Sequence, residues 1–315
     1  MTPKALARGP FSFGRWLAVL TTAACLAGCQ TAPPTLPPAP VVAAPPEVPA
    51  VVPRPPPRLP RIGLALGGGA ARGFAHIGVI QVLEEAGVRP DMVVGTSAGS
   101  LVAAMYASGK TGQEMALLAQ TMDEGAITDW SFPARGLIRG EALARYVREQ
   151  TGGRSIEQMK LPLGIVATDL DNGTPILFQR GDTGAAVRAS SAVPAVFQPV
   201  KIGSREYVDG GLVSPVPVRF ARQMGAELVI AVDISSLPDG NATSDVMKML
   251  LQTFAIMGRS INQFELKDAD IVLRPLLAGV SSADFTARMK AIQAGREAAL
   301  RLLPDLKAKI TSLMR

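Results

Sequence analysis

Short apolar runs alternate with helix-like patterns along most of this chain. Residues 62–66 form a nearly continuous apolar run, as is typical of a strand that is buried on both faces. Apolar positions at helical spacing follow between residues 74 and 83. A second apolar run at 92–94 precedes another helical pattern at 101–107. This order predicts a strand–helix–strand–helix opening.

The alternation continues toward the C-terminal end. We expect further strands at 164–167, 176–178, 228–232 and 271–273. We expect further helices around Val187 and at 218–223, 246–261 and 284–303. Apolar strands that alternate with helices are typical of a sheet with both faces covered. The pattern therefore predicts an α/β fold of three layers, with a largely parallel central sheet and helices on both faces.

Residues 115–146 interrupt this regular pattern. The segment contains Trp130, Phe132 and Pro133. Aromatic side chains in an irregular segment suit a cap or lid over a site, and they suit ordinary core packing as well. Both interpretations stay open at this stage.

The first 28 residues have the pattern of an export signal. Three basic residues precede an apolar stretch at 16–24 that is too short to cross a bilayer. The sequence Leu-Ala-Gly-Cys at 26–29 then resembles a bacterial lipobox, which is cleaved before the cysteine and acylated on it. We therefore expect a signal peptide at 1–28 and lipidation of Cys29, with an ordinary signal peptide as the alternative.

The residues after Cys29 suit a lipid-anchored protein. Residues 30–60 contain half of the 26 prolines of the chain. Proline-rich segments extend by about 3.1 Å per residue, so this stretch predicts a linker between the anchor and a folded domain at 61–315. Gln30 replaces the aspartate associated with inner-membrane retention. We expect a protein of the bacterial cell envelope that is anchored to the outer membrane, on its periplasmic or its surface face.

Composition narrows the classes of partner. A hydrophobic content of 48% in 315 residues agrees with one large core. Loss of the signal leaves 29 basic residues against 26 acidic ones, so the net charge falls from +6 to +3. A mild positive charge permits attraction to anionic lipid. Because no basic run is interleaved with aromatic residues, we expect no nucleic-acid partner.

The sharpest motif is Gly-Thr-Ser-Ala-Gly at 95–99, where a predicted strand ends and a helix begins. Gly95 and Gly99 leave room for a strained turn that projects the hydroxyl of Ser97 from the edge of the sheet. The following amide and the helix N-terminus then face developing negative charge. This context predicts a serine nucleophile, and the alternative is a serine that caps the helix.

A glycine-rich loop at 67–73 lies between the first strand and its helix. Its backbone N–H groups can approach an anion closely, so it suits a dinucleotide phosphate cradle, an oxyanion hole or a close-packed turn. The dinucleotide role fits poorly, because the spacing differs from G-x-G-x-x-G and no acidic residue ends the second strand. An oxyanion hole fits the loop better.

A serine nucleophile needs a base. The only histidine, His76, precedes Ser97, whereas the histidine of α/β-hydrolases comes last in the chain. Asp209 ends an extended run and is followed by Gly210 and Gly211. By itself, Asp-Gly-Gly is usually a surface turn. Either His76 works in an unusual geometry, or a carboxylate or lysine accepts the proton.

These motifs, in this order, resemble the patatin-like phospholipase family over residues 62–232. In that family a G-G-x-x-R-G loop supplies the oxyanion hole, G-x-S-x-G bears the nucleophile, and D-G-G or D-G-A completes a Ser-Asp dyad. The resemblance implies that Ser97 and Asp209 form the dyad. It also implies an oxyanion hole at Gly68, Gly69, Ala70 and Arg72.

Several positions refine this resemblance. Ala70 stands where many members of the family have glycine, and this is costly only if its φ angle is positive. Arg72 either orients the loop, holds a substrate phosphate or forms a surface salt bridge. Residues 188–200 are similar to the family segment before the D-G-G turn. Residues 167–170 are similar to a recurring bacterial stretch, in which we expect Asp169 to be structural.

The resemblance implies a lipid acyl hydrolase of the phospholipase A or lysophospholipase type. Such an enzyme would cleave the carboxylic ester of a lipid or another acyl ester through an acyl-enzyme on Ser97, with no metal and no cofactor. One alternative is a catalytically silent lipid-binding or envelope scaffold protein of the same fold. The other is a nucleotide-binding protein that uses the glycine loop.

Overall fold

The computed structural model describes residues 58–123, 125, 127, 129, 136–236 and 245–314. The expected signal peptide, Cys29, nearly all of the proline-rich linker and Trp130, Phe132 and Pro133 lie outside these residues. The boundaries expected at 28 and 60 therefore stay predictions. Among the described helices, none has the length and apolar character needed to span a bilayer.

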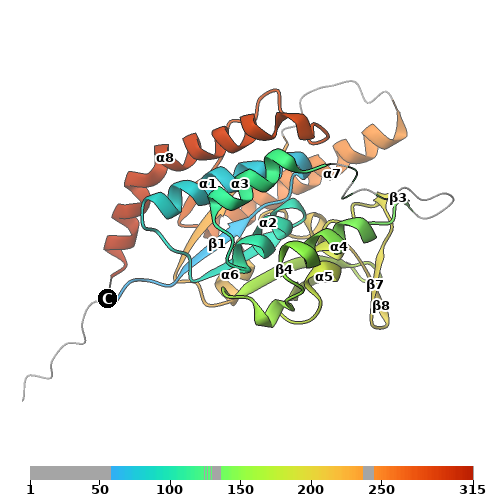
Figure 1. The fold of residues 1–315 in the computed structure, drawn as a ribbon, viewed down its shortest axis with the longest axis horizontal. Helices are drawn as coiled ribbons and strands as arrows, with labels where there is room; N and C mark the ends of the chain where they lie inside the picture. The colour runs from blue at the N-terminus through green and yellow to red at the C-terminus, as the bar shows by residue number, and fades with distance from the viewer. Residues whose placement is uncertain are drawn as a thin grey trace, which may run out of the picture. The chain divides into compact units, whose positions relative to one another are not determined.

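A sheet of eight strands forms the centre of the domain (Figure 1). Five neighbouring strands run parallel, in the order β10 (Ile271–Leu273), β9 (Leu228–Val232), β1 (Ile62–Leu66), β2 (Met92–Thr96) and β4 (Leu163–Asp169). Three strands are antiparallel to their neighbours, namely β8 (Arg205–Asp209), β7 (Val200–Ile202) and β5 (Pro175–Phe178). A separate pair consists of β3 (Gly136–Ile138) and β6 (Ala195–Phe197).

Helices cover both faces of this sheet. One face is covered by α1 (Phe74–Glu85), α2 (Ala98–Ala107), α3 (Gly112–Thr121), α4 (Glu141–Gln150), α5 (Thr183–Ser190) and α8 (Arg288–Ser312). The other face is covered by α6 (Val218–Gln223). Helix α7 (Val246–Glu265) comes between β9 and β10 in the chain. Leu64 and Leu66 of β1 join the core on the first face, whereas Ala65 joins the cluster beside α6. Burial on both faces explains the continuous apolar run, and the predicted α/β fold class is confirmed.

The described parts of residues 115–146 contain regular elements that the sequence pattern did not indicate. Helix α3 ends at Thr121, and α4 begins at Glu141. The start of α3 is a capping box, in which Thr111 accepts the backbone N–H of Glu114 and the Glu114 carboxylate accepts the backbone N–H of Thr111. This Thr-x-x-Glu signal was present in the sequence. Trp130, Phe132 and Pro133, on which the lid interpretation of residues 115–146 depends, lie outside the described residues, so the lid stays a prediction.

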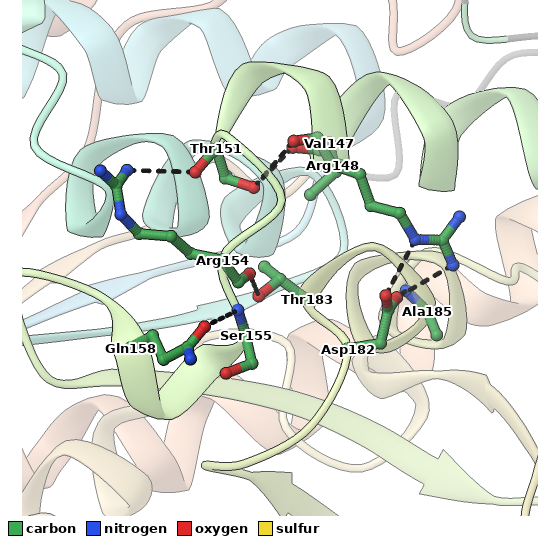
Figure 2. A network of polar contacts seen from close by, with 9 residues as sticks. All are labelled: Val147, Arg148, Thr151, Arg154, Ser155, Gln158, Asp182, Thr183 and Ala185. Carbon is green, nitrogen blue, oxygen red and sulfur yellow. Dashed lines mark hydrogen bonds and ion pairs between the residues drawn. The ribbon is translucent and has the colours of Figure 1, made fainter.

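A network of polar contacts joins α4 to the beginning of α5 (Figure 2). The Arg148 guanidinium pairs with the carboxylate of Asp182, with Nε 2.9 Å from Oδ2, and Asp182 also caps α5. Thr183 Oγ1 donates a hydrogen bond to the carbonyl of Arg154 at 2.7 Å. These contacts fix the start of the helix whose last residue, Ser190, lies in the candidate site.

Candidate active site

Ser97 occupies a strained turn between β2 and α2. Its φ angle is +53° and its ψ angle is −125°, a conformation that non-glycine residues rarely adopt. Both flanking glycines are required by close packing, since a Cβ on Gly99 would lie 2.1 Å from the carbonyl oxygen of Leu66. A Cβ on Gly95 would lie 2.3 Å from the carbonyl oxygen of Gly99. The motif at 95–99 therefore projects its serine as a sharp strand-to-helix elbow.

The side chain of Ser190 supports this elbow from α5. The backbone N–H of Ser97 donates to Ser190 Oγ at 2.9 Å, and the Ser190 hydroxyl donates to the carbonyl of Val166 at 2.5 Å. Ser190 is completely buried. Sequence reasoning assigned no role to this residue, although the segment 188–200 resembled the family. Ser190 therefore ties the elbow to β4 and is a positioning residue.

Asp209 and Ser97 meet across β4. Thr96 of β2 pairs with Val166 of β4, and Asp209 of β8 pairs with the next residue, Ala167. The Ser97 hydroxyl donates a hydrogen bond to Asp209 Oδ2 at 2.7 Å, within the range that direct proton transfer requires. The two sequence-predicted dyad residues are thus in direct contact, although 112 positions separate them.

The Asp-Gly-Gly turn shapes the surroundings of this carboxylate. The backbone N–H of Gly211 donates to Asp209 Oδ1 at 2.7 Å. A Cβ on Gly210 would lie 2.2 Å from the carbonyl oxygen of Val166, so only glycine fits there. Burial raises the pKa of the Asp209 carboxyl to about 6, and the hydrogen bonds from Gly211 and Ser97 oppose this rise. Asp209 is therefore a stronger base than an exposed carboxylate.

His76 contacts the glycine loop and is not positioned as the base for Ser97. Its side chain is fully buried in α1, and Nε2 donates to the carbonyl oxygen of Gly67 at 2.8 Å. Burial lowers its pKa to about 4, so the imidazole is neutral at pH 7. Among the described residues, Nδ1 has no hydrogen-bond partner and no bond joins His76 to Ser97 or Asp209. His76 is placed to hold the loop.

Glycine loop residues lie directly beside Ser97. The N–H of Gly68 donates to the carbonyl of Pro215 at 2.9 Å, and a Cβ on Gly68 would lie 3.1 Å from Ser97 Cβ. Gly68 thus leaves space for the serine, but its amide is already engaged. The amides of Gly69 and Ala70 donate no hydrogen bond to any residue that the structure describes. Of the amides of Gly68, Gly69 and Ala70, these two therefore remain available as hydrogen-bond donors.

Ala70 and Arg72 are two residues of this loop that are not expected from a simple run of glycines. Ala70 has a φ angle of +49°, so the alanine pays the steric cost of a left-handed conformation that glycine avoids. The guanidinium of Arg72 contacts Ser236, with Nη1 donating to Ser236 Oγ at 2.5 Å. This contact links the loop to the segment after β9. It favours the loop-orienting role of Arg72 over a direct contact with substrate.

A small apolar cavity of about 60 Å³ opens beside the dyad. Its lining includes Ala70 of the loop and Ala98, the residue after Ser97. The lining also includes Leu101, Met105, Met115 and Leu118. Such a lining suits an acyl chain whose carbonyl lies at Ser97. A larger polar groove beside Asp270 lies at the amino end of β10. Ser97 lies at the other end of the parallel strands, after the carboxyl end of β2.

Asp169 is outside this chemistry. Its carboxylate pairs with the guanidinium of Arg205 at 2.6 Å and accepts the backbone N–H of Asp171 at 3.0 Å. These contacts fix the end of β4, as expected of a structural aspartate. Among the described residues, no group of three or more histidine, cysteine or acidic side chains is arranged to hold a metal ion.

Comparisons with known proteins place these features in a family. A family model described as patatin-like phospholipase matches residues 64–222. An uncharacterized NTE family protein of Mycobacterium tuberculosis is 40% identical over 186 residues, which is 58% of this chain and 51% of the relative. Patatin-like phospholipase domain-containing protein 6 of Mus musculus is 36% identical over 184 residues, 56% of this chain and 14% of that protein.

A solved structure shares the fold. The crystal structure of VipD from Legionella pneumophila matches with a TM-score of 0.54 and 14% sequence identity, covering 79% of this chain and 67% of VipD. At that identity the likeness concerns the fold alone. The chain spans about half the length of the NTE family relatives that it matches.

Proposed function

The chain belongs to the patatin-like phospholipase family, and from that premise we propose that it is a lipid acyl hydrolase acting on carboxylic esters. One observation supports this proposal above the others, namely the 2.7 Å hydrogen bond from the Ser97 hydroxyl to the buried Asp209 carboxylate. A serine that merely capped α2 would need no buried carboxylate against its oxygen. A nucleotide-binding loop would need no strained serine beside it.

The first half of the proposed reaction forms an acyl-enzyme. Ser97 Oγ attacks the ester carbonyl carbon while its proton passes to Asp209 Oδ2, so a tetrahedral intermediate forms with its charge on the former carbonyl oxygen. The amides of Gly69 and Ala70, with the first amide of α2, are suited to donate to that oxyanion. The protonated Asp209 then returns its proton to the leaving alkoxide, and the alcohol departs as acyl-Ser97 remains.

The second half hydrolyses this intermediate. A water molecule attacks the acyl carbon while Asp209 accepts one of its protons. The second tetrahedral intermediate collapses, Ser97 Oγ leaves, and the proton on Asp209 returns to it. The products are a carboxylic acid and the free enzyme, so atoms and protons balance over the cycle. The raised pKa of Asp209 helps in both halves, because it brings the acidity of the carboxyl closer to the working pH.

The apolar cavity supports an acyl chain as the recognised part of the substrate. Its lining includes Ala70 of the glycine loop and Ala98, the residue after Ser97. Phospholipase A or lysophospholipase activity is consistent with that placement, because both reactions release a fatty acid. The ester bond of a lipid is therefore the proposed target.

Labelling with a fluorophosphonate probe tests the activated serine. We expect the wild-type chain to be labelled and Ser97→Ala to be unlabelled. Ser191→Ala is a matched control, because the Ser191 side chain makes no hydrogen bond among the described residues. Hydrolysis of a panel of acyl esters and phospholipids then defines the substrate. An unlabelled, inactive wild-type protein that still binds lipid would instead support a scaffold of the same fold.

We also propose that Cys29 is acylated and anchors the domain to the outer membrane of the bacterial envelope. The support is the sequence at 26–29 and the proline-rich linker that follows it. Several acyl chains suffice for anchoring, since burial is worth about 0.8 kcal/mol per CH₂. Metabolic labelling with a palmitate analogue should mark the wild-type protein and Cys25→Ser but not Cys29→Ser. Equal labelling of all three would contradict the assignment.

A further inference from the structure

Helix α7 (Val246–Glu265) is largely uncovered. Of its 20 residues, only Asn262 and Glu265 are buried. Val246 is 84% exposed and Phe264 is 70% exposed. The other exposed large apolar side chains of the helix are Met249, Leu251, Ile256 and Met257. In Figure 1 the N-terminal end of α7 (orange) lies at the periphery of the domain. An exposed apolar helix of this length indicates a binding surface.

Most of these apolar side chains share one face of the helix. Val246, Met249, Ile256, Met257 and Phe264 follow one another at intervals of 3, 7, 1 and 7 residues, which fits the helical repeat. We call these five residues the α7 apolar stripe. Such a helix suits the plane of a lipid interface, where the apolar side is buried at the boundary between head groups and acyl chains.

The charges along α7 suit an anionic surface. Between residues 246 and 267 the only acidic residue is Glu265, which is buried. Asp245, just before the helix, pairs with Lys248 at 3.6 Å, so Arg259 and Lys267 supply the exposed positive charge. A second copy of this helix would offer no acidic partner to these cations. Anionic lipid head groups would complement them.

The anchored end of α7 contacts the support of the glycine loop. Glu265 Oε1 accepts a hydrogen bond from Ser214 Oγ at 2.6 Å. Gly258 of α7 packs against Pro215, the residue after Ser214, because a Cβ on Gly258 would lie 3.4 Å from Pro215 Cγ. The Pro215 carbonyl in turn accepts the N–H of Gly68, which lies against Ser97. Helix α7 therefore contacts Ser214 and Pro215, and Pro215 supports the glycine loop beside Ser97.

We infer that the α7 apolar stripe docks this domain onto an anionic lipid bilayer and so brings the ester-cleaving site to its substrate. The inference rests on the proposed function for its biological meaning, but the docking itself does not require turnover. It adds a second membrane contact to the proposed lipid anchor. The anchor would set the distance from the membrane, and α7 would set the orientation of the domain against it.

Vesicle flotation tests this inference without the anchor. The protein is made as the expected mature chain from residue 29 onward, with Cys29→Ser so that no acyl chain is attached and with Ser97→Ala so that no hydrolysis alters the lipid. Vesicles contain phosphatidylethanolamine and phosphatidylglycerol in a ratio of about three to one. Ile256→Asp and Met257→Asp each change a side chain that is 51% or 50% exposed, and Leu300→Asp on α8 is a matched control at 51%. All proteins are checked by thermal melt and light scattering.

We expect Ile256→Asp and Met257→Asp to weaken vesicle binding by about tenfold or more, and Leu300→Asp to leave it within about twofold. Equal binding by all variants would overturn the inference. A wild-type dimer that dissociates on Ile256→Asp would also overturn it, because the stripe would then be an interface between two copies. If vesicles bind as expected while the protein with an intact Ser97 hydrolyses no ester, docking stands and the proposed hydrolase activity fails.

Discussion

The hydroxyl of Ser190 accepts a hydrogen bond from the backbone N–H of Ser97, 93 residues earlier in the chain, at 2.9 Å. The same hydroxyl donates to the carbonyl of Val166. One buried side chain therefore holds the strained elbow against the central sheet. The alignment of the proposed nucleophile therefore depends on a side chain that is hydrogen-bonded to the backbone of Ser97.

Replacing Ser190 with alanine should loosen this elbow. The change leaves the Ser97 amide and the Val166 carbonyl without their partner, and each unsatisfied buried group costs about 1–3 kcal/mol. We expect a lower melting temperature and a kcat reduced by about tenfold, with the pH at half-maximal rate unchanged. Ser191→Ala is the control and should resemble wild type in both measurements. A wild-type kcat in Ser190→Ala would remove the positioning role.

Glycine at position 70 should stabilise the protein. Ala70 has a φ angle of +49°, and a left-handed conformation costs an alanine about 1–2 kcal/mol. Part of that gain is lost because glycine makes the unfolded chain more flexible, so we expect about 0.5–1 kcal/mol in the free energy of unfolding. Ala71→Gly is the control. Because Ala71 has no positive φ, this change should lower the free energy of unfolding. Urea denaturation of both variants measures the difference.

The rate should depend on the ionisation of Asp209. Proton transfer from Ser97 requires the carboxylate form, and burial raises the pKa of Asp209 to about 6. The value of kcat/KM for a soluble ester should therefore increase as the pH rises through about 6 and level off above pH 7. The pKa of His76 is about 4, so the imidazole stays neutral over this range and adds no step. A profile with its midpoint near pH 4 would contradict this assignment.

A larger side chain in the apolar cavity should shorten the preferred acyl chain. Leu118 lines the cavity, whereas its neighbour Leu117 is 53% exposed and does not. We expect Leu118→Phe to lose at least tenfold in kcat/KM on a decanoyl ester and little on an acetyl ester. Leu117→Phe should behave as wild type on both. Equal losses on the two esters by Leu118→Phe would place the acyl chain elsewhere.

The sequence predicted the buried parallel strands well, because burial on both faces leaves a continuous apolar run. The bounds of β9 and β10 match the expected ranges, and those of α6 match as well. The strand β8 was identified only as an extended run before Asp209, because its burial changes from exposed to buried along five residues. Periodicity does not indicate which strand a short run pairs with. The antiparallel pairing of β8 with β4 is what brings Asp209 to Ser97.

Other features of the site depend on the path of the backbone. The residue types in the sequence do not specify that path. A serine at the end of a helix gives no local sign that it accepts an amide from a distant turn, so Ser190 was missed. The positive φ of Ala70 follows from the path of the loop. The engagement of Gly68 with Pro215 follows from tertiary contacts, so the sequence did not separate Gly68 from Gly69 and Ala70 as donors.

The most direct test of the Ser97–Asp209 dyad compares two variants by kcat on a soluble acyl ester, after thermal melts show that both are folded. Asp209→Asn removes the base, and His76→Gln keeps a donor toward Gly67 while it removes the imidazole. We expect Asp209→Asn to lose about 10³-fold or more and His76→Gln to stay within about tenfold of wild type. A folded Asp209→Asn with nearly wild-type kcat, together with an inactive His76→Gln, would contradict the dyad and make histidine the base.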